Sequence, residues 1–207
     1  MRRHATNDPA TLQWSLYALA DTLEREAKLS EAEPLYRELI ARPNANQPVN
    51  DRVPSPVVGF ARCLTELAWT EHKQGKSEEA RSHASNAEAL LREGLKIRKE
   101  QASDDDWQLA EIRSRLGSAL LIATLADPAL APATRDSKFG EAEALLLDAG
   151  ERLRDDPSVE PAFKRDAIQR LVRLYEAWNS AVPNGGMAQK AAEWRQQLAS
   201  FEKGVSK

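Results

Sequence analysis

The sequence predicts an all-α protein built as a stack of helical hairpins. Ala and Leu occur 33 and 25 times in 207 residues, whereas Val, Ile and Thr together occur 20 times and Gly 9 times. Ala and Leu are strong helix formers, and β-sheets favour the β-branched residues that are scarce here. Apolar residues also recur at spacings of three and four along most of the chain, which is the period of a helix with one buried face.

Apolar stripes identify the helices in order. Four stripes mark the first helix of each expected pair: Leu12–Leu16–Leu19–Leu23, Leu64–Leu67–Ala68, Leu109–Ile112–Leu116–Leu120 and Ile168–Leu171–Tyr175–Trp178. Pro34 does not break the second helix, because Ser30 and Glu33 form a capping box that puts Pro34 near the first turn. The expected helices are 9–27, 30–42, 57–74, 77–100, 105–126, 137–155, 161–179 and 187–203.

Prolines and turn residues mark the connections between these helices. Four prolines predict a linker over 43–56, and Pro128 and Pro132 predict an insertion over 124–136. The acidic run Asp104–Asp106 is expected to cap the fifth helix, because carboxylates interact favourably with a helix N-terminus. We expect residues 1–207 to form a single domain.

Small residues recur where the first helix of a pair is expected to meet the second. The first helices carry Ala20, Ala68 and Gly117 there, and the second helices carry Ala32, Ala80, Ala142 and Ala191. Small side chains let two helix backbones approach closely, and a repeated close approach is typical of a stacked array of hairpins.

On these residues the chain resembles the tetratricopeptide repeat (TPR) family. The repeats cover about 9–43, 57–100, 105–155 and 161–203, and the first matches the motif best, through Leu16, Leu19, Ala20, Leu23, Ala27, Leu29, Ala32, Tyr36 and Leu39, with Pro43 just after. The resemblance implies a right-handed superhelix, or solenoid, of about four TPR-like hairpins. It also implies that the first helices line a concave surface that binds a protein or peptide.

A narrower resemblance lies in the second half of the chain. It is carried by 95–98, 110–117, 141–146, 170–178 and 190–195. These segments are similar to the kinesin-light-chain-like TPR regions found C-terminal to bacterial serine/threonine protein kinases. The chain contains no Gly-rich loop, His-Arg-Asp or Asp-Phe-Gly motif, so the resemblance does not extend to phosphotransfer. It implies a regulatory or substrate-docking region.

The charge and the cysteine count restrict the surroundings and the partners. The net charge is −3, so the chain lacks the basic field that gives nucleic-acid binders most of their affinity. No uncharged run reaches the length of about 20 residues that a membrane span needs. The N-terminal residues lack the apolar segment of a secretory signal, and Cys63 is the only cysteine. We therefore expect a cytoplasmic chain that binds neither nucleic acid nor membrane.

No motif predicts catalysis, a metal or a cofactor. His72 and His83 are separated by a helix break, and no His-x3-His or Cys-x2-Cys spacing occurs. Neither Gly-x-Ser-x-Gly nor His-Glu-x-x-His is present. We expect a protein that is not an enzyme, with no catalytic residue, no metal ligand and no cofactor.

The TPR resemblance implies which side chains face the concave groove. The predicted partner-binding residues are Trp14, Tyr17, Arg62, Thr65, Trp69, Lys73, Ser114, Ser118 and Arg173. Trp, Tyr and Arg are the residues that most often dominate interfaces. Trp14 and Trp69 fit packing between repeats equally well, and Trp107, Trp178 and Trp194 are expected to lie in the core.

Some TPR domains hold a C-terminal carboxylate with a clamp of Lys and Asn side chains. The corresponding positions here are Tyr17, Asp21, Glu66, Glu111 and Arg115. Three of the five are acidic and would repel a carboxylate. The sequence therefore favours a peptide with a basic or aromatic anchor.

Four functions remain open at this point. The first is a non-catalytic scaffold or adaptor that binds a protein or peptide in the groove. The second is the regulatory region of a bacterial serine/threonine kinase. The third is self-association through the Ala-rich helix from Met187 to Phe201, and the fourth is regulation by a small peptide in the groove. The sequence leaves the oligomeric state open.

Overall fold

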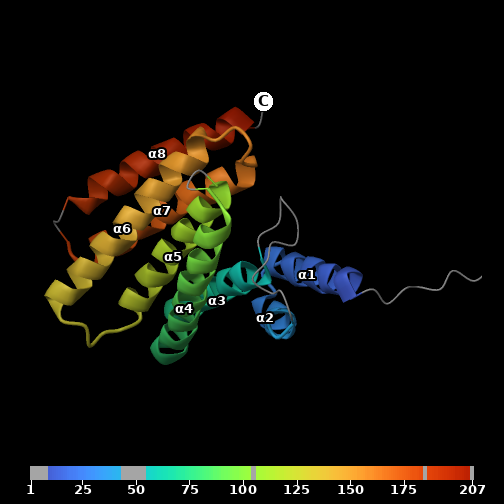
Figure 1. The fold of residues 1–207 in the computed structure, drawn as a ribbon. Coiled ribbons are helices and arrows are strands. Elements are labelled where there is room, and N and C mark those ends of the chain that lie inside the picture. Colours follow the sequence, from blue (N-terminus) through green and yellow to red (C-terminus); the bar gives the residue numbers. More distant parts are fainter. Residues whose placement is uncertain (1–8, 43–54, 104–105, 184–185, 206–207) are drawn as a thin grey trace, which may run out of the picture.

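The all-α prediction is confirmed. The computed structural model describes residues 9–42, 55–103, 106–183 and 186–205, and this part of the chain forms eight α-helices and no β-strand. The helices succeed one another as hairpins (Figure 1). They are α1 (Pro9–Arg25), α2 (Leu29–Ile40), α3 (Pro56–Lys73), α4 (Ser77–Gln101), α5 (Trp107–Leu125), α6 (Pro132–Asp155), α7 (Pro161–Ala181) and α8 (Met187–Val205).

The helices pack as a stack in which the odd-numbered helices lie closer to one another than the even-numbered helices do. Each helix contacts the next one along the chain, and α1, α3, α5 and α7 also contact their odd-numbered neighbours. Among the described residues, no such backbone contact joins one even-numbered helix to another. The odd-numbered helices therefore form the inner row of a solenoid of hairpins, and the even-numbered helices are spread outside it.

Helix α5 lies at the centre of the stack. It contacts α3, α4, α6 and α7, and 15 of its 19 residues are buried. Its sequence is apolar or small around most of the helix, which is typical of a helix surrounded by others rather than of one with a single buried face. The main apolar core extends through this helix from Tyr36 on α2 to Tyr175 on α7.

The first two hairpins share one turn geometry. Ala27 and Gly75 follow α1 and α3 with positive φ angles of 59° and 78°. The Lys28 amide donates to the Leu23 carbonyl at 2.8 Å, and the Lys76 amide donates to the Glu71 carbonyl at 2.9 Å. These bonds close a helix end of the Schellman type, in which the left-handed residue is usually glycine. The two turns are therefore equivalent, although one of them carries an alanine.

Small residues occupy positions of close helix approach. A Cβ added to Gly59 would lie 2.8 Å from Tyr36 Cε1, and one added to Gly117 would lie 2.7 Å from Leu146 Cγ. The alanines that the sequence placed at helix crossings are all buried: Ala20, Ala32, Ala68, Ala80, Ala142 and Ala191. Their burial agrees with the predicted close crossings.

Several helix starts differ from the expectation. Lys28 is the N-cap of α2 and makes no side-chain hydrogen bond there, so Ser30 lies inside the helix and does not cap it. Helix α6 begins at Pro132 instead of 137, because proline fits a first helical turn. This start reduces the expected insertion over 124–136 to a short connection after α5.

Two predicted segments fall partly outside the described residues. Of the linker expected over 43–56, the structure describes only the last two residues: Ser55 accepts a hydrogen bond from the Val58 amide at 3.4 Å, and Pro56 begins α3. Of the acidic run 104–106 it describes only Asp106, which caps α5 by accepting a hydrogen bond from the Gln108 amide at 2.9 Å. The predicted cap of α5 is therefore confirmed for Asp106.

Replacing Ala27 with glycine is expected to stabilise the fold by about 1 kcal/mol, since the left-handed conformation costs a residue with a Cβ about 1–2 kcal/mol. Urea denaturation of the full chain measures the change in the free energy of unfolding. Ala89, which is exposed in the middle of α4, provides the control, because Ala89→Gly is expected to destabilise by about 0.5–1 kcal/mol. A loss of stability in Ala27→Gly would contradict the assigned turn.

Candidate functional site

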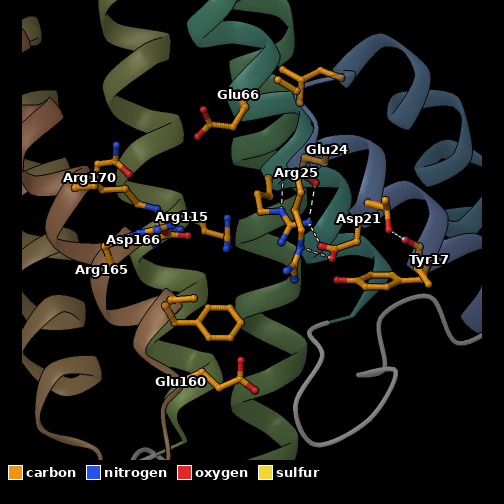
Figure 2. A pocket seen from close by; sticks show the side chains of 18 of the residues that line it. Tyr17, Asp21, Glu24, Arg25, Glu66, Arg115, Glu160, Arg165, Asp166 and Arg170 are labelled. Atoms are coloured by element: carbon orange, nitrogen blue, oxygen red, sulfur yellow. Dashed lines mark hydrogen bonds and ion pairs between the residues drawn. The ribbon is translucent and has the colours of Figure 1, made fainter. Parts of the chain in front are cut away.

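A groove of about 1170 Å³ lies across the odd-numbered helices (Figure 2). Helix α1 supplies one wall and α7 the opposite wall, while α3 and α5 lie between them. The side chains used below are Trp14, Tyr17, Asp21, Glu24 and Arg25 from α1, Arg62 and Glu66 from α3, Arg115 from α5, and Phe163, Arg165, Asp166, Gln169, Arg170 and Arg173 from α7. The exposed rim also includes Glu160.

Arg62 joins α3 to the α1 wall. Its Nη2 donates to Asp21 Oδ1 at 2.5 Å and to Glu24 Oε2 at 2.7 Å. The same nitrogen donates to the hydroxyl of Tyr36 on α2 at 3.0 Å, and this hydroxyl donates to Glu24 Oε2 at 3.0 Å. Asp21 also accepts from Arg25 Nε at 2.8 Å. Arg62 thus has two carboxylate partners and holds together three helices.

The surroundings favour the charged guanidinium at Arg62 and the neutral phenol at Tyr36. Burial is the largest single influence and acts to lower the pKa of Arg62, but Glu24, Tyr36 and Tyr17 together outweigh it and hold this pKa well above its usual value. Burial raises the pKa of Tyr36 far above its usual value, with Arg62 acting in the opposite direction. Both groups therefore keep the protonation state that their hydrogen bonds require.

A second buried cluster joins α5 to α7. Arg170 Nη1 and Nη2 donate to the two carboxylate oxygens of Glu111 at 3.1 and 3.2 Å. Arg170 Nη1 also donates to Ser114 Oγ at 2.9 Å. Arg115 forms an ion pair with the same Glu111, whose side chain is only 1% exposed. Two buried arginines therefore share one buried carboxylate.

The two arginines differ in how well their charge is stabilised. Burial is the largest single influence and acts to lower the pKa of Arg170, but Glu111, Asp166 and Glu66 together outweigh it and leave this pKa above its usual value. The pKa of Arg115 is lowered by burial, and the neighbouring cations Arg170 and Arg62 lower it further against the attraction of Glu111. The fold therefore disfavours the charge on Arg115 and favours the charge on Arg170.

A third interaction joins α7 directly to α3. Arg173 Nη1 donates to the two carboxylate oxygens of Glu66 at 2.9 and 3.3 Å. The guanidinium carbon of Arg173 lies 5.6 Å from the centroid of the Trp69 ring, which is within the range of a cation–π contact. This contact covers Trp69 from the side of α7.

Four of the nine predicted partner-binding residues line the groove. Trp14 is 44% exposed, and Arg62 and Arg173 are partly buried by their ion pairs. Tyr17 lines the groove but is buried, with its ring centroid 6.0 Å from that of Tyr36 in an edge-to-face arrangement. Of these four, Trp14 offers the most surface to a partner.

The structure places the other five predicted residues away from the groove lining. Thr65 and Ser118 are buried within the helix stack, and Ser114 is buried as the acceptor for Arg170. Trp69 packs against the cluster of Ala68, Ala84 and Ile122, so the alternative of packing between repeats applies to it. Lys73 is exposed in the last turn of α3. Ser114 and Ser118 were expected in the groove because α5 was treated as a helix with an open face, whereas 15 of its 19 residues are buried.

The expectation missed Arg170, Phe163 and Arg165, which line the groove on α7. Arg115 was considered only as a clamp position, although it is the lining residue from α5. Counting the arginines on the first helix of each pair would have indicated Arg170, Arg165 and Arg115, but not Phe163.

Most of the acidic residues in and beneath the groove are ion-paired with arginines. Asp21 and Glu24 pair with Arg62, Glu66 pairs with Arg173, and Glu111 pairs with Arg115 and Arg170. The sequence argument against an anionic ligand counted these carboxylates without the arginines that neutralise them. That argument therefore loses its physical basis.

The three tryptophans expected in the core are partly buried in apolar clusters. Trp107 packs against Phe163 with ring centroids 5.1 Å apart, and Trp178 stacks on Phe139 at 5.2 Å. Trp194 packs against the main core.

Burial raises the pKa of the Cys63 thiol to about 12, so this cysteine is a buried, unreactive side chain.

Two kinds of feature are absent from the part of the chain that the structure describes. It contains no cluster of three or more His, Cys, Asp or Glu side chains arranged to bind a metal ion. None of its helices combines the length and the apolar character that crossing a membrane requires.

Glu111→Gln is expected to destabilise the protein by about 3 kcal/mol, because it leaves Arg115 and Arg170 buried without their shared carboxylate. Adding Arg115→Gln to this variant should recover part of the loss, since it removes one of the two uncompensated charges. Urea denaturation measures both changes. The exposed pair of Glu78 with Arg81 provides the control, and Glu78→Gln should change stability by less than about 0.5 kcal/mol. Equal stability of Glu111→Gln and the wild type would contradict the arrangement.

No protein-family model and no curated protein matches the chain. Among solved structures, a de novo designed helical repeat protein matches with a TM-score of 0.42 and 18% identity, over 96% of each chain. A putative kinesin light chain from Podospora anserina with nearly identical TPR-like repeats matches with a TM-score of 0.31 and 16% identity, over 97% of this chain and 99% of the other. Neither similarity is close enough to assign a family, so membership of the TPR family stays a prediction.

Proposed function

We propose that this protein is a non-catalytic interaction module that binds a segment of a partner protein in the groove between α1 and α7. The observation that carries the proposal is the groove itself, because one surface of about 1170 Å³ collects side chains from all four odd-numbered helices. Such a volume exceeds the 300–1,000 Å³ typical of small-molecule pockets. It suits a peptide segment that contacts several hairpins at once.

The chemistry of the groove also supports recognition of a polypeptide. Trp14 on the α1 wall and Phe163 on the α7 wall supply apolar surface, and the arginines between them supply hydrogen-bond donors. Aromatic and Arg side chains are the residues that most often carry interface energy. Most of the charged side chains are already ion-paired, so a partner need not neutralise a large field in order to bind.

The role of the titratable groups supports a non-catalytic function. In and beneath the groove, Glu24, Glu66 and Glu111 bind arginines of neighbouring helices. A general base or nucleophile needs a group that is free to exchange a proton or attack a substrate. These carboxylates have a structural role instead.

Self-association through α8 receives no support from its surface. The large hydrophobic residues that are strongly exposed among the described residues are Leu12, Trp14 and Leu19, all on α1. On α8, Ala191 is buried and Trp194 packs against the core. The kinase-associated role rests on the sequence resemblance alone and stays a prediction.

Trp14→Ala is expected to weaken binding of the partner about tenfold, because truncating an interface tryptophan commonly costs more than 1 kcal/mol. The partner is first captured from a lysate of the source organism, identified and purified, and its dissociation constant is then measured by calorimetry. Leu12→Ala provides a matched control, since Leu12 is 49% exposed on the same helix but does not line the groove.

The comparison of the two variants decides the proposal. Leu12→Ala should bind within about twofold of the wild type, and both variants should retain the helical circular dichroism of the parent. Wild-type affinity in Trp14→Ala, or a larger loss in Leu12→Ala, would place the binding surface outside the groove.

A further inference from the structure

The buried arginines of the groove differ in how many carboxylates they pair with. On the α1 side, Arg62 has two carboxylate partners, Asp21 and Glu24. On the α7 side, Arg115 and Arg170 have only Glu111 between them. Within this buried cluster, two guanidinium groups therefore share one carboxylate.

The hydrogen bonding of Arg115 is incomplete as well. Its side chain is 7% exposed, and its Nε is buried without a hydrogen-bond partner. Arg62 Nε, by contrast, forms an ion pair with Glu24, and Arg62 has two carboxylates and a tyrosine hydroxyl around its guanidinium. Among the described residues, the ion pair of Arg115 is with Glu111. Both carboxylate oxygens of Glu111 also accept hydrogen bonds from Arg170. An uncompensated buried donor on a charged group is costly to the fold.

Arg115 is placed where a ligand in the groove would meet it. Figure 2 shows its guanidinium between the α7 group of Arg170 and Asp166 on one side and the α1 group of Asp21 and Glu24 on the other. It is the α5 side chain that lines the groove. Asp21, Glu24 and Glu66 are paired, and Asp166 pairs with Arg165 at 2.8 Å, so the acidic side chains nearest to Arg115 are largely neutralised.

We propose that Arg115 is an oxyanion subsite on the floor of the groove, which binds one carboxylate side chain of an acidic partner peptide. This inference rests on the proposed function and adds the chemistry of the ligand. A carboxylate carries the single negative charge that the pair of arginines lacks, and it accepts two hydrogen bonds from a guanidinium. Trp14 and Phe163 then contact the residues that flank the acidic one.

Three capped peptides of one sequence serve as probes: an alanine-rich peptide with a central Glu-Trp-Glu, its Gln-Trp-Gln counterpart, and a version with phosphoserine in place of each Glu. Nitrogen-15 NMR of the full chain follows the Arg115 Nε–Hε signal, which is assigned by its loss in Arg115→Lys. The indole signal of Trp14 reports occupation of the groove independently of charge.

The Glu peptide is expected to shift both signals and to bind at least about tenfold more tightly than the Gln peptide, since a hydrogen bond to a charged group contributes about 1.5–3 kcal/mol. Arg115→Gln should remove this preference while keeping the fold, because Glu111 remains bound to Arg170 through both oxygens. Arg113→Gln provides the matched control on the same helix, since Arg113 pairs with Asp148 of α6 outside the groove and this variant should behave as the wild type.

The outcomes separate this inference from the proposed function. Equal affinity for the Glu and Gln peptides, or wild-type preference in Arg115→Gln, overturns the oxyanion subsite, and a shifted Trp14 signal in the same titration leaves the groove itself intact. No response of either signal to any peptide overturns the subsite and counts against the groove. Tighter binding of the phosphoserine peptide, lost in Arg115→Gln, supports the oxyanion chemistry and assigns its source to phosphate.

Discussion

Pairing between arginines and carboxylates of different hairpins determines the character of the inner face. Arg62 of α3 binds Asp21 and Glu24 of α1, Arg170 of α7 binds Glu111 of α5, and Arg173 of α7 binds Glu66 of α3. These pairs connect the odd-numbered helices through polar groups, so the space between α1 and α7 is not filled by apolar side chains. Removing buried charges from water offsets much of the attraction within each pair, and such pairs contribute more to geometry than to net stability. The groove follows from this polar inner face.

The apolar packing that stabilises the fold lies around this polar face. Helix α5 is buried on most sides, and the core runs through it from Tyr36 to Tyr175. Gly59 and Gly117 permit approaches that a Cβ would prevent. The core thus fixes the spacing of the hairpins. The arginine side chains then reach carboxylates on neighbouring odd-numbered helices across this spacing. Arg115 is the place where the match is imperfect, because it shares Glu111 with Arg170 and its Nε lacks a hydrogen-bond partner among the described residues. A cost of this kind at a surface groove is typical of residues retained for binding rather than for stability.

The sequence predicted much of the fold and less of the groove, for physical reasons that differ by residue. Helices were predictable because the apolar period is local, and the cap at Asp106 depends only on the next few residues. Trp14 and Tyr17 line the groove, as the TPR resemblance implied from their positions on the first helix. Ser114 and Ser118 were expected to face the groove, but both are buried because α5 has almost no exposed face. The partners of Arg170 and Arg173 lie 59 and 107 residues away, and no local pattern encodes such pairs. The argument that carboxylates would be repelled left out these arginines for the same reason.

Hydrogen–deuterium exchange of the protein with and without its purified partner tests the central claim most directly, because it maps the contact surface along the whole chain. The account predicts slower exchange in the peptides of α1 and α7 that line the groove, with the largest change around Trp14 and Phe163. Peptides from the outer faces of α4, α6 and α8 should exchange as in the free protein. Protection confined to these even-numbered helices, with α1 and α7 unchanged, would contradict the claim that the inner face is the binding surface.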